Sequence, residues 1–273
     1  MPKTKVLITV KTYPSLSSKY DELVCTAGFL EDGTWVRIYP IQFRKKSFDQ
    51  RYRKYDWIEI NLVKNNSDFR PESFRPYSHD TEIKILDHID TKGNWHLRKE
   101  IVFKKKIYTD LNQLIEDAKN RELLTSLATF KPSKILGFLW EEVDRNWDEV
   151  KLDKIKQQRN TLFTTESEDL FEVVQKLPYK FFYIFEDEKG TKSKMMIEDW
   201  EIGQLYWNCL KRHEGNERKA VEDVRKKYFD VFAKTRDLHF FLGTTKAHHF
   251  RGRNPFVIIG TFHPKIEIQQ SLF

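Results

Sequence analysis

Cysteine and long apolar runs are scarce in this chain of 273 residues, and each scarcity excludes a class of protein. Two cysteines, Cys25 and Cys209, are too few for a disulfide framework, and both lie in apolar stretches typical of buried thiols in a reducing compartment. The apolar runs, such as Phe256–Ile259, fall short of the roughly 20 residues that a membrane span requires. No basic segment followed by an apolar one opens the sequence, which argues against a signal peptide. We therefore expect a cytoplasmic protein without a membrane partner.

Several motifs of catalysis and cofactor binding are also missing. The sequence contains no phosphate-binding loop of the form G-x-x-x-x-G-K-[ST], no G-x-G-x-x-G, no H-E-x-x-H and no G-x-S-x-G. It has no C-x-x-C pair, which excludes zinc fingers and zinc deaminases. Any chemistry is thus expected to proceed with no cofactor and no bound metal.

Charged and aromatic residues are abundant by contrast. Aromatic side chains make up 14% of the chain, which excludes simple disorder because a disordered segment has no core in which to bury them. The net charge of +7 is concentrated at the two ends. Residues 1–79 carry 14 Lys and Arg against 9 Asp and Glu, and residues 234–265 carry 6 against 1, whereas residues 80–233 carry 28 against 30. Two basic segments rich in aromatic residues are typical of a protein that binds a nucleic-acid backbone.

The N-terminal third has the spacing of short strands separated by turns. The predicted strands are Lys5–Lys11, Leu23–Leu30, Thr34–Tyr39 and Asp56–Val63, with Thr81–Asp87 and Trp95–Phe103 as candidates for two more. We expect a small twisted sheet or a β-barrel over residues 1–105.

The rest of the chain predicts mixed α and β structure. Thr109 is a good N-cap for a helix over Asp110–Ala128, Lys134–Val143 predicts a strand, and residues 144–165 form either a helix or a linker. Residues 106–165 are therefore expected to be a helical connector. Beyond it, over residues 166–268, we expect strands at Phe181–Phe185, Lys192–Ile197, Leu238–Leu242 and Phe256–Phe262 and helices at 199–212 and 217–234. The predicted fold class is α+β, with a C-terminal mixed subdomain.

The clearest local signal for binding is the loop over residues 243–254, G-T-T-K-A-H-H-F-R-G-R-N, between two apolar strands. Arg side chains grip phosphate oxygens, and Phe or His stacks on a base. The N-terminal segment adds cations interleaved with tyrosines, and strand alternation puts Arg37 and Tyr39 on one face. The candidate nucleic-acid-binding residues are Tyr13, Lys19, Tyr20, Arg37, Tyr39, Arg44, Arg51, Arg53, Lys246, His248, His249, Phe250, Arg251 and Arg253. A metal role for His248 and His249 is disfavoured, since no Cys, Asp or Glu follows at a ligand spacing.

Three carboxylates are candidates for acid–base catalysis. Asp199 and Glu201 flank Trp200 where a predicted strand meets a helix, so an aromatic wall would raise a carboxyl pKa there. The alternative for Asp199 is an N-cap of that helix. Glu22 follows a Ser/Lys/Tyr loop and would face a pocket lined by Tyr13 and Lys19, or else be an ordinary strand-end carboxylate.

These patterns favour a DNA-binding protein, and we expect a DNA-processing enzyme of repair or anti-phage defence. Base excision is slightly favoured, because hydrolysis of an N-glycosidic bond needs one carboxylate and an aromatic pocket for an extruded base. A metal-dependent nuclease is an alternative, in which Asp68, Glu82 and Lys84 would hold Mg²⁺ and the attacking water. A non-catalytic DNA- or RNA-binding module is another.

Two resemblances extend over parts of the chain. The segments V-L-I-T-V-K-T-Y-P-S-L-S-S-K-Y-D-E-L-V-C-T-A-G, Trp35–Arg44, Arg70–Ser73 and Ile197–Tyr206 resemble a family of uncharacterised bacterial proteins, which implies no activity. Lys54–Ile60 resembles the K-G-D-x-I-x-I strand of small β-barrel nucleic-acid modules of the PUA or OB kind, with Tyr55 in place of Gly.

The last five residues, Q-Q-S-L-F, resemble the pentapeptide by which bacterial polymerases and repair proteins dock on the sliding clamp. Leu272 and Phe273 would fill an apolar pocket while Gln269 bonds at its rim, and Gln270 departs from the usual Leu. The sliding clamp is therefore a second expected partner beside DNA, and an adaptor acting through protein contacts is a further hypothesis.

Overall fold

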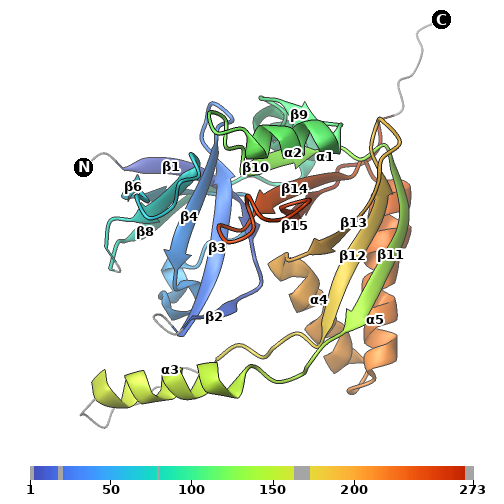
Figure 1. Ribbon diagram of the computed structural model, residues 1–273. Helices are drawn as coiled ribbons and strands as arrows, with labels where there is room; N and C mark the ends of the chain where they lie inside the picture. The colour runs from blue at the N-terminus through green and yellow to red at the C-terminus, as the bar shows by residue number, and fades with distance from the viewer. Residues whose placement is uncertain (1–2, 18–20, 79, 163–172, 268–273) are drawn as a thin grey trace, which may run out of the picture.

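Two β-sheets with helices around them organise the chain in the computed structural model, which describes residues 3–17, 21–78, 80–162 and 173–267 (Figure 1). Strands β1 to β8 form the first sheet and β9 to β15 the second. The predicted α+β class is therefore confirmed. No described helix combines the length and apolar character needed to cross a bilayer.

The first sheet curls into a half-barrel. Its strands are β1 (Thr4–Lys11), β2 (Ser15–Ser17), β3 (Asp21–Phe29), β4 (Trp35–Ile41), β5 (Asp56–Ile60), β6 (Leu62–Lys64), β7 (Ser73–Pro76) and β8 (Ile83–His88). They lie in the order β6-β7-β4-β3-β1-β5-β8, with β2 paired to β3. Asn61 alone separates β5 from β6, yet four strands lie between these two in the sheet, so the sheet must bend back on itself.

Strand alternation decides which side chains fill the half-barrel. Val6 and Ile8 of β1 belong to its interior cluster, together with Ile58 of β5 and Tyr52. The Tyr52 hydroxyl lies 2.6 Å from Thr26 Oγ1, so this large buried ring keeps a hydrogen bond. Two 3₁₀ turns, Phe43–Lys45 and Phe48–Gln50, follow β4.

The second sheet has the order β11-β12-β13-β15-β14-β10-β9. Its strands are β9 (Ile107–Tyr108), β10 (Leu127–Phe130), β11 (Lys134–Glu142), β12 (Tyr179–Glu186), β13 (Lys192–Ile197), β14 (His239–Thr244) and β15 (Phe256–Phe262). One face is covered by α2 (Leu111–Lys119), α4 (Trp200–Arg212), α5 (Glu217–Arg225) and the π-helix Lys226–Ala233. Helix α3 (Glu149–Leu162) lies between β11 and β12 in sequence, and Figure 1 shows it away from the second sheet.

The two sheets share a core between them. Leu7, Phe29 and Trp57 of the half-barrel pack with Phe241 and Ile259 of the second sheet, and α1 (Lys92–Val102) adds Val102. Phe29 and Phe241 meet edge to face with ring centroids 6.0 Å apart. A bulge between Ile8 and Val10 turns Val10 toward this second core. The part of the outer face that carries Leu7, Phe29 and Trp57 is therefore buried rather than exposed to solvent.

The structure differs from the sequence-based expectations in the middle of the chain. Residues 95–103 are not a strand, since residues 96–102 form the regular part of α1, in which the buried Arg98 and Val102 lie four residues apart. The helix expected over Asp110–Ala128 ends at Lys119, and Asp110 caps it in place of Thr109 by accepting from Asn112 and Gln113 amides.

Residues 106–165 are not a separate helical connector. Strands β9, β10 and β11 from this range belong to the second sheet. All four residues of Leu127–Phe130 are buried, as expected for a strand that is covered on both faces. Its sequence therefore lacks the alternation of apolar and polar residues by which a half-buried strand is recognised. The single strand expected over Asp56–Val63 is divided into β5 and β6 by the turn of the barrel at Asn61.

Candidate nucleic-acid interface

A cleft of about 500 Å³ opens between the half-barrel and the second sheet. Both basic ends of the chain reach it, since Tyr13, Arg37 and Tyr39 come from the N-terminal segment and Lys246 from the loop after β14. Its aromatic lining is Tyr13, Tyr39, Trp147 and Tyr179, and its charged lining is Arg37, Arg70, Lys176, Lys180, Lys246 and Glu198. Five cations thus face one carboxylate between aromatic walls.

Two arginines form the polar floor of this cleft. Arg37 is 2% exposed and donates to Ser126 Oγ at 2.7 Å, to Ser126 O at 3.0 Å and to Thr244 O at 3.4 Å. Arg70 donates to the same Thr244 carbonyl, and Asp68 holds it through two hydrogen bonds of 2.8 and 2.5 Å. Burial lowers the pKa of Arg37, and the nearby carboxylates Glu72 and Asp68 oppose only part of this shift. The pair joins the end of β14 to the half-barrel through the Thr244 carbonyl.

The aromatic walls are fixed through their polar ends. The Tyr13 hydroxyl donates to Gln175 O at 2.7 Å and accepts from Trp207 Nε1 at 2.8 Å. Trp147 Nε1 donates to Val174 O at 2.7 Å, and the Tyr179 hydroxyl donates to Glu217 at 2.8 Å. Because these bonds occupy the polar ends, Tyr13 and Trp147 are left to face the cleft with their half-buried rings, whereas Tyr179 is 6% exposed and belongs mainly to the core.

Glu198 is the carboxylate of the cleft, and sequence reasoning missed it by one position. It follows β13, where its amide donates to Ile258 O at 2.8 Å and its carbonyl accepts from the Tyr13 amide at 3.0 Å. Burial raises the pKa of its carboxyl group, against a smaller lowering by Lys180. It forms no ion pair with any residue that the structure describes. Glu198 lines the cleft, whereas Asp199, the next residue, does not line it and is bound to Lys54.

The expected catalytic residues Asp199 and Glu201 lie outside this cleft lining, around a buried lysine. Asp199 is fully buried, caps α4 by accepting from the Glu201 amide at 3.2 Å, and takes Lys54 Nζ at 2.8 Å on both oxygens. Glu201 lies 3.0 Å from the same Nζ. Burial disfavours the charge of Lys54, but these two carboxylates more than offset it and raise the pKa of Lys54. Asp199 is therefore the N-cap of α4, as the alternative prediction for this residue stated.

Glu22, the third expected catalytic residue, is also buried. Its Oε2 accepts from Arg44 at 2.7 Å and from the Val174 amide at 3.1 Å. Its Oε1 has no partner among the described residues. Glu22 does not line the cleft. The pKa of the Tyr13 hydroxyl is raised mainly by burial, and the nearby charge of Glu22 adds to this shift.

The remaining N-terminal cations lie apart from the cleft. Arg51 donates to Lys46 O at 2.7 Å and to Arg44 O at 2.8 Å, and so braces the segment after β4. Arg53 is 74% exposed and reaches Asp56 at 3.6 Å. Lys19, Tyr20, Gln269, Leu272 and Phe273 lie outside the described residues.

The loop over residues 243–254 presents some of its expected binding residues and buries one. His249 has no exposed surface, and its ring nitrogens lie 2.8 Å from Thr244 Oγ1 and 2.7 Å from Ala118 O. Burial lowers the pKa of His249, so we assign it a structural role. Phe250 is 50% exposed and stacks on Phe69 at 5.1 Å, above a depression that Lys119 and Arg121 also line. His248, Arg251 and Arg253 are exposed as expected.

The residues expected to hold a metal do not assemble into a site. Asp68 has both oxygens occupied by Arg70 and Ser73, and these hydrogen bonds outweigh its burial and lower its pKa to about 2. Glu82 and Lys84 are exposed at and beside β8. No group of three or more potential metal ligands occurs among the residues that the structure describes.

Family relationships follow the same division into two halves. Residues 108–273 match a domain of unknown function, DUF8757, over more than half of the chain. The chain belongs to this family. Residues 2–104 match a second domain of unknown function, DUF8758. No curated protein matches the chain. Among solved structures, a murine DNA-binding protein bound to double-stranded DNA is similar at 11% identity and a TM-score of 0.32, over 99% of this chain and 100% of that one.

Proposed function

We propose that this protein binds DNA and holds one unstacked base in the cleft between its two sheets. The observation that supports this most directly is the lining of the cleft, in which Lys176, Lys180 and Lys246 surround fixed aromatic rings. Lysines neutralise phosphates, and aromatic rings stack on a base that has left its helix. The exposed Phe69 and Phe250 stack, with Lys119 and Arg121, offers a neighbouring surface for the strand.

We further propose base excision as the chemistry, with Glu198 as the acid–base group. Hydrolysis of an N-glycosidic bond needs a carboxylate that activates water or stabilises the oxocarbenium-like transition state. Glu198 meets this need better than Glu22, Asp199 or Glu201, since each of those three is held by a cation. Burial raises the pKa of Glu198, and Lys180 beside it favours the ionised form and opposes part of that shift.

A non-catalytic DNA-binding module is the second candidate. It is favoured by the same ion pairs, which engage Glu22, Asp199 and Glu201, the three acid–base candidates from the sequence. The sliding clamp as a partner, through Gln269, Leu272 and Phe273, and a cytoplasmic location both stay predictions from the sequence.

One experiment separates these candidates. The protein is incubated with end-labelled single-stranded DNA, duplex DNA and duplex DNA with one unpaired base at about 50 mM salt, and anisotropy is followed by heat–alkali treatment and gel analysis. Base excision gives alkali-labile sites, whereas a binding module raises anisotropy without breaks. Absence of binding to every DNA at that salt contradicts the whole proposal, and binding to RNA alone contradicts the choice of DNA.

The role of Glu198 has its own variant and control. Glu198→Gln keeps the size of the side chain and should slow excision by about 10²- to 10⁴-fold while leaving DNA affinity unchanged. Glu188→Gln, on the exposed turn between β12 and β13, removes the same charge away from the cleft and should leave the rate unchanged. Equal rates for the two variants would remove Glu198 from the chemistry.

A further inference from the structure

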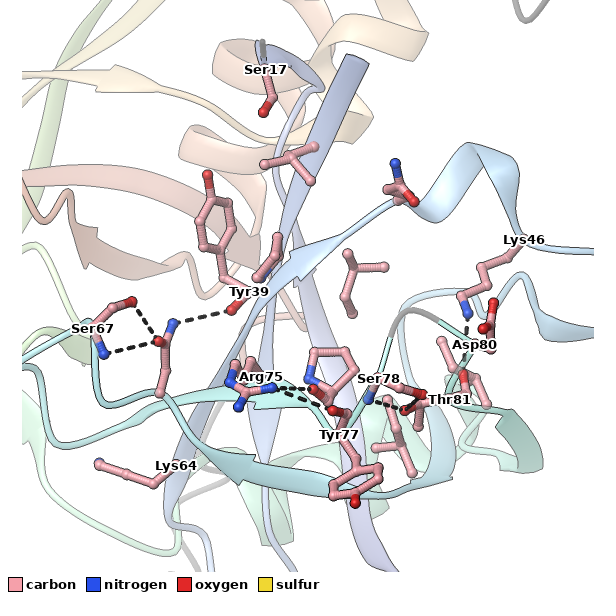
Figure 2. A pocket seen from close by; sticks show the side chains of 18 of the residues that line it. Ser17, Tyr39, Lys46, Lys64, Ser67, Arg75, Tyr77, Ser78, Asp80 and Thr81 are labelled. Atoms are coloured by element: carbon pink, nitrogen blue, oxygen red, sulfur yellow. Dashed lines mark hydrogen bonds between the residues drawn. The ribbon is translucent and has the colours of Figure 1, made fainter. Parts of the chain in front are cut away.

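A second cavity, of about 820 Å³, lies at the rim of the half-barrel. Four buried apolar side chains, Leu23, Ile41, Ile60 and Ile83, contribute to its lining. Polar residues such as Ser78 and Thr81 also line it (Figure 2). The volume is within the range of roughly 300–1,000 Å³ usual for binding pockets. We call it the rim groove.

The walls of the rim groove carry more positive than negative charge. Lys46, Lys64 and Arg75 line it against one carboxylate, Asp80. Arg75 is exposed, and its Nη1 donates to the carbonyls of Pro76 and Tyr77 at 3.3 Å, as the dashed lines in Figure 2 mark. No carboxylate of the described residues pairs with it. An arginine has five N–H donors, so this guanidinium is held in place with donors left for an anion.

The rim groove and the cleft share one lining residue, which is aromatic. Tyr39 lines both cavities, and in Figure 2 its ring points away from Arg75 and Tyr77. Beside it, Lys246 of the cleft donates to the carbonyl of Ser67 of the rim groove. Cations line both cavities, and Tyr39 lines both as well. This arrangement suits a charged polymer that spans two sites better than one small molecule in a single pocket.

We infer that the rim groove binds the nucleotide next to the one in the cleft, so that the ligand is a single strand of DNA crossing over Tyr39. Arg75 and Lys64 would contact the phosphate of that nucleotide, and the rings of Tyr39 and Tyr77 would contact sugar and base. The inference rests on the proposed function, because it extends the same strand beyond the cleft.

A length series tests it directly. Affinity is measured by fluorescence anisotropy or competition for thymidine monophosphate, a dinucleotide and an eight-nucleotide thymidine strand at about 50 mM salt. We expect the eight-nucleotide strand to bind at least about tenfold more tightly than the mononucleotide, because a second base and phosphate enter the rim groove. Arg75→Gln and Lys64→Ala should each remove much of this gain and leave mononucleotide affinity unchanged.

Controls make each outcome decisive. Arg218→Ala removes an exposed arginine from α5, on the far side of the second sheet, and should preserve the gain. Melting curves by circular dichroism identify any variant that fails to fold, and Arg75→Lys, which keeps the charge, should then retain part of the gain. If mononucleotide and strand bind equally, or the gain survives both rim-groove substitutions, the inference is overturned while the cleft proposal stands. If none of the ligands binds, both fall.

Discussion

At the residue scale, the buried ion pair of Lys54 and Asp199 ties the half-barrel to the start of α4. The two residues are 145 positions apart in sequence, and Nζ lies 2.8 Å from each carboxylate oxygen. A pair of this kind gives little stability over an apolar substitute, but the loss of one partner leaves the other charge buried. Its value is therefore best measured by a substitution that removes charge and keeps shape.

Asp199→Asn is that substitution. Asn still caps a helix well, so the change isolates the charge. We expect the free energy of unfolding in urea to fall by about 3 kcal/mol, since Lys54 then keeps only the partly exposed Glu201 as a counter-ion. Glu59→Gln, which breaks the exposed pair with Lys3, should cost less than about 1 kcal/mol. Equal costs for the two variants would contradict a buried, charged Lys54.

Lys11 gives a prediction in pH. Burial, and then the charge of Lys54, lower the pKa of Lys11 from 10.5 to about 8. Between pH 8 and 10.5 the unfolded chain therefore binds a proton there that the folded protein has lost, so this group makes the protein more stable as pH rises. The free energy of unfolding in urea, taken as wild type minus Lys11→Met, should therefore increase from pH 8 to pH 10. A constant or falling difference would contradict the lowered pKa.

At the element scale, the packing of α4 positions one wall of the cleft. A Cβ on Gly203 would lie 2.3 Å from Tyr13 Cδ2 and 2.5 Å from Cε2, so only glycine lets the helix approach this ring so closely. Tyr13 is in turn anchored by Trp207 of the same helix and by Gln175. The helix and the cleft wall therefore form one packed unit.

Gly203→Ala should disturb both stability and binding. The added methyl group must push Tyr13 or α4 aside, which we expect to cost about 1–3 kcal/mol of unfolding free energy and to weaken DNA binding several-fold. Gly137→Ala is the matched control, because its Cβ would meet Ile184 only at 3.8 Å, and it should be nearly neutral in both measurements. Binding that is unchanged in Gly203→Ala would separate Tyr13 from the binding surface.

Several elements were open to prediction because their signal is local. The cap of α4, the strands at its N-terminal side and the hairpin of β3 and β4 follow from neighbouring residues, and alternation correctly put Arg37 and Tyr39 toward one cavity. Strand β10 and helix α1 could not be predicted from the sequence, because partners distant in sequence decide which of their residues are buried. Glu198 was missed for the same reason: its backbone pairs with Ile258 and Tyr13, which are distant in sequence, and these partners place it at the cleft.

At the scale of the whole molecule, the shared core makes the two family domains one folding unit. Leu7, Phe29 and Trp57 lie on the outside of the half-barrel, in a core that they share with residues of α1, β10, β14 and β15. Without the second sheet, part of this apolar surface would be exposed to water. We therefore expect a single unfolding transition for the chain.

Phe241→Ala tests this expectation. Phe241 is fully buried between the sheets, and its removal should cost about 3–5 kcal/mol and lower the urea midpoints of tryptophan fluorescence and far-ultraviolet circular dichroism together. Phe48→Ala, at a side chain that is 90% exposed, should leave both midpoints unchanged. Two separated transitions in either protein would mean that the halves unfold independently.

The contact of Arg37 and Arg70 with one backbone carbonyl also has an evolutionary consequence. Both guanidiniums recognise the oxygen of Thr244 rather than its side chain, while the Thr244 hydroxyl serves His249. Drift at position 244 between threonine and serine would keep all of these bonds, whereas lysine at position 37 or 70 would lose the planar fork that reaches several acceptors at once. Lineages of this family should therefore vary at the acceptor and remain fixed at the two donors.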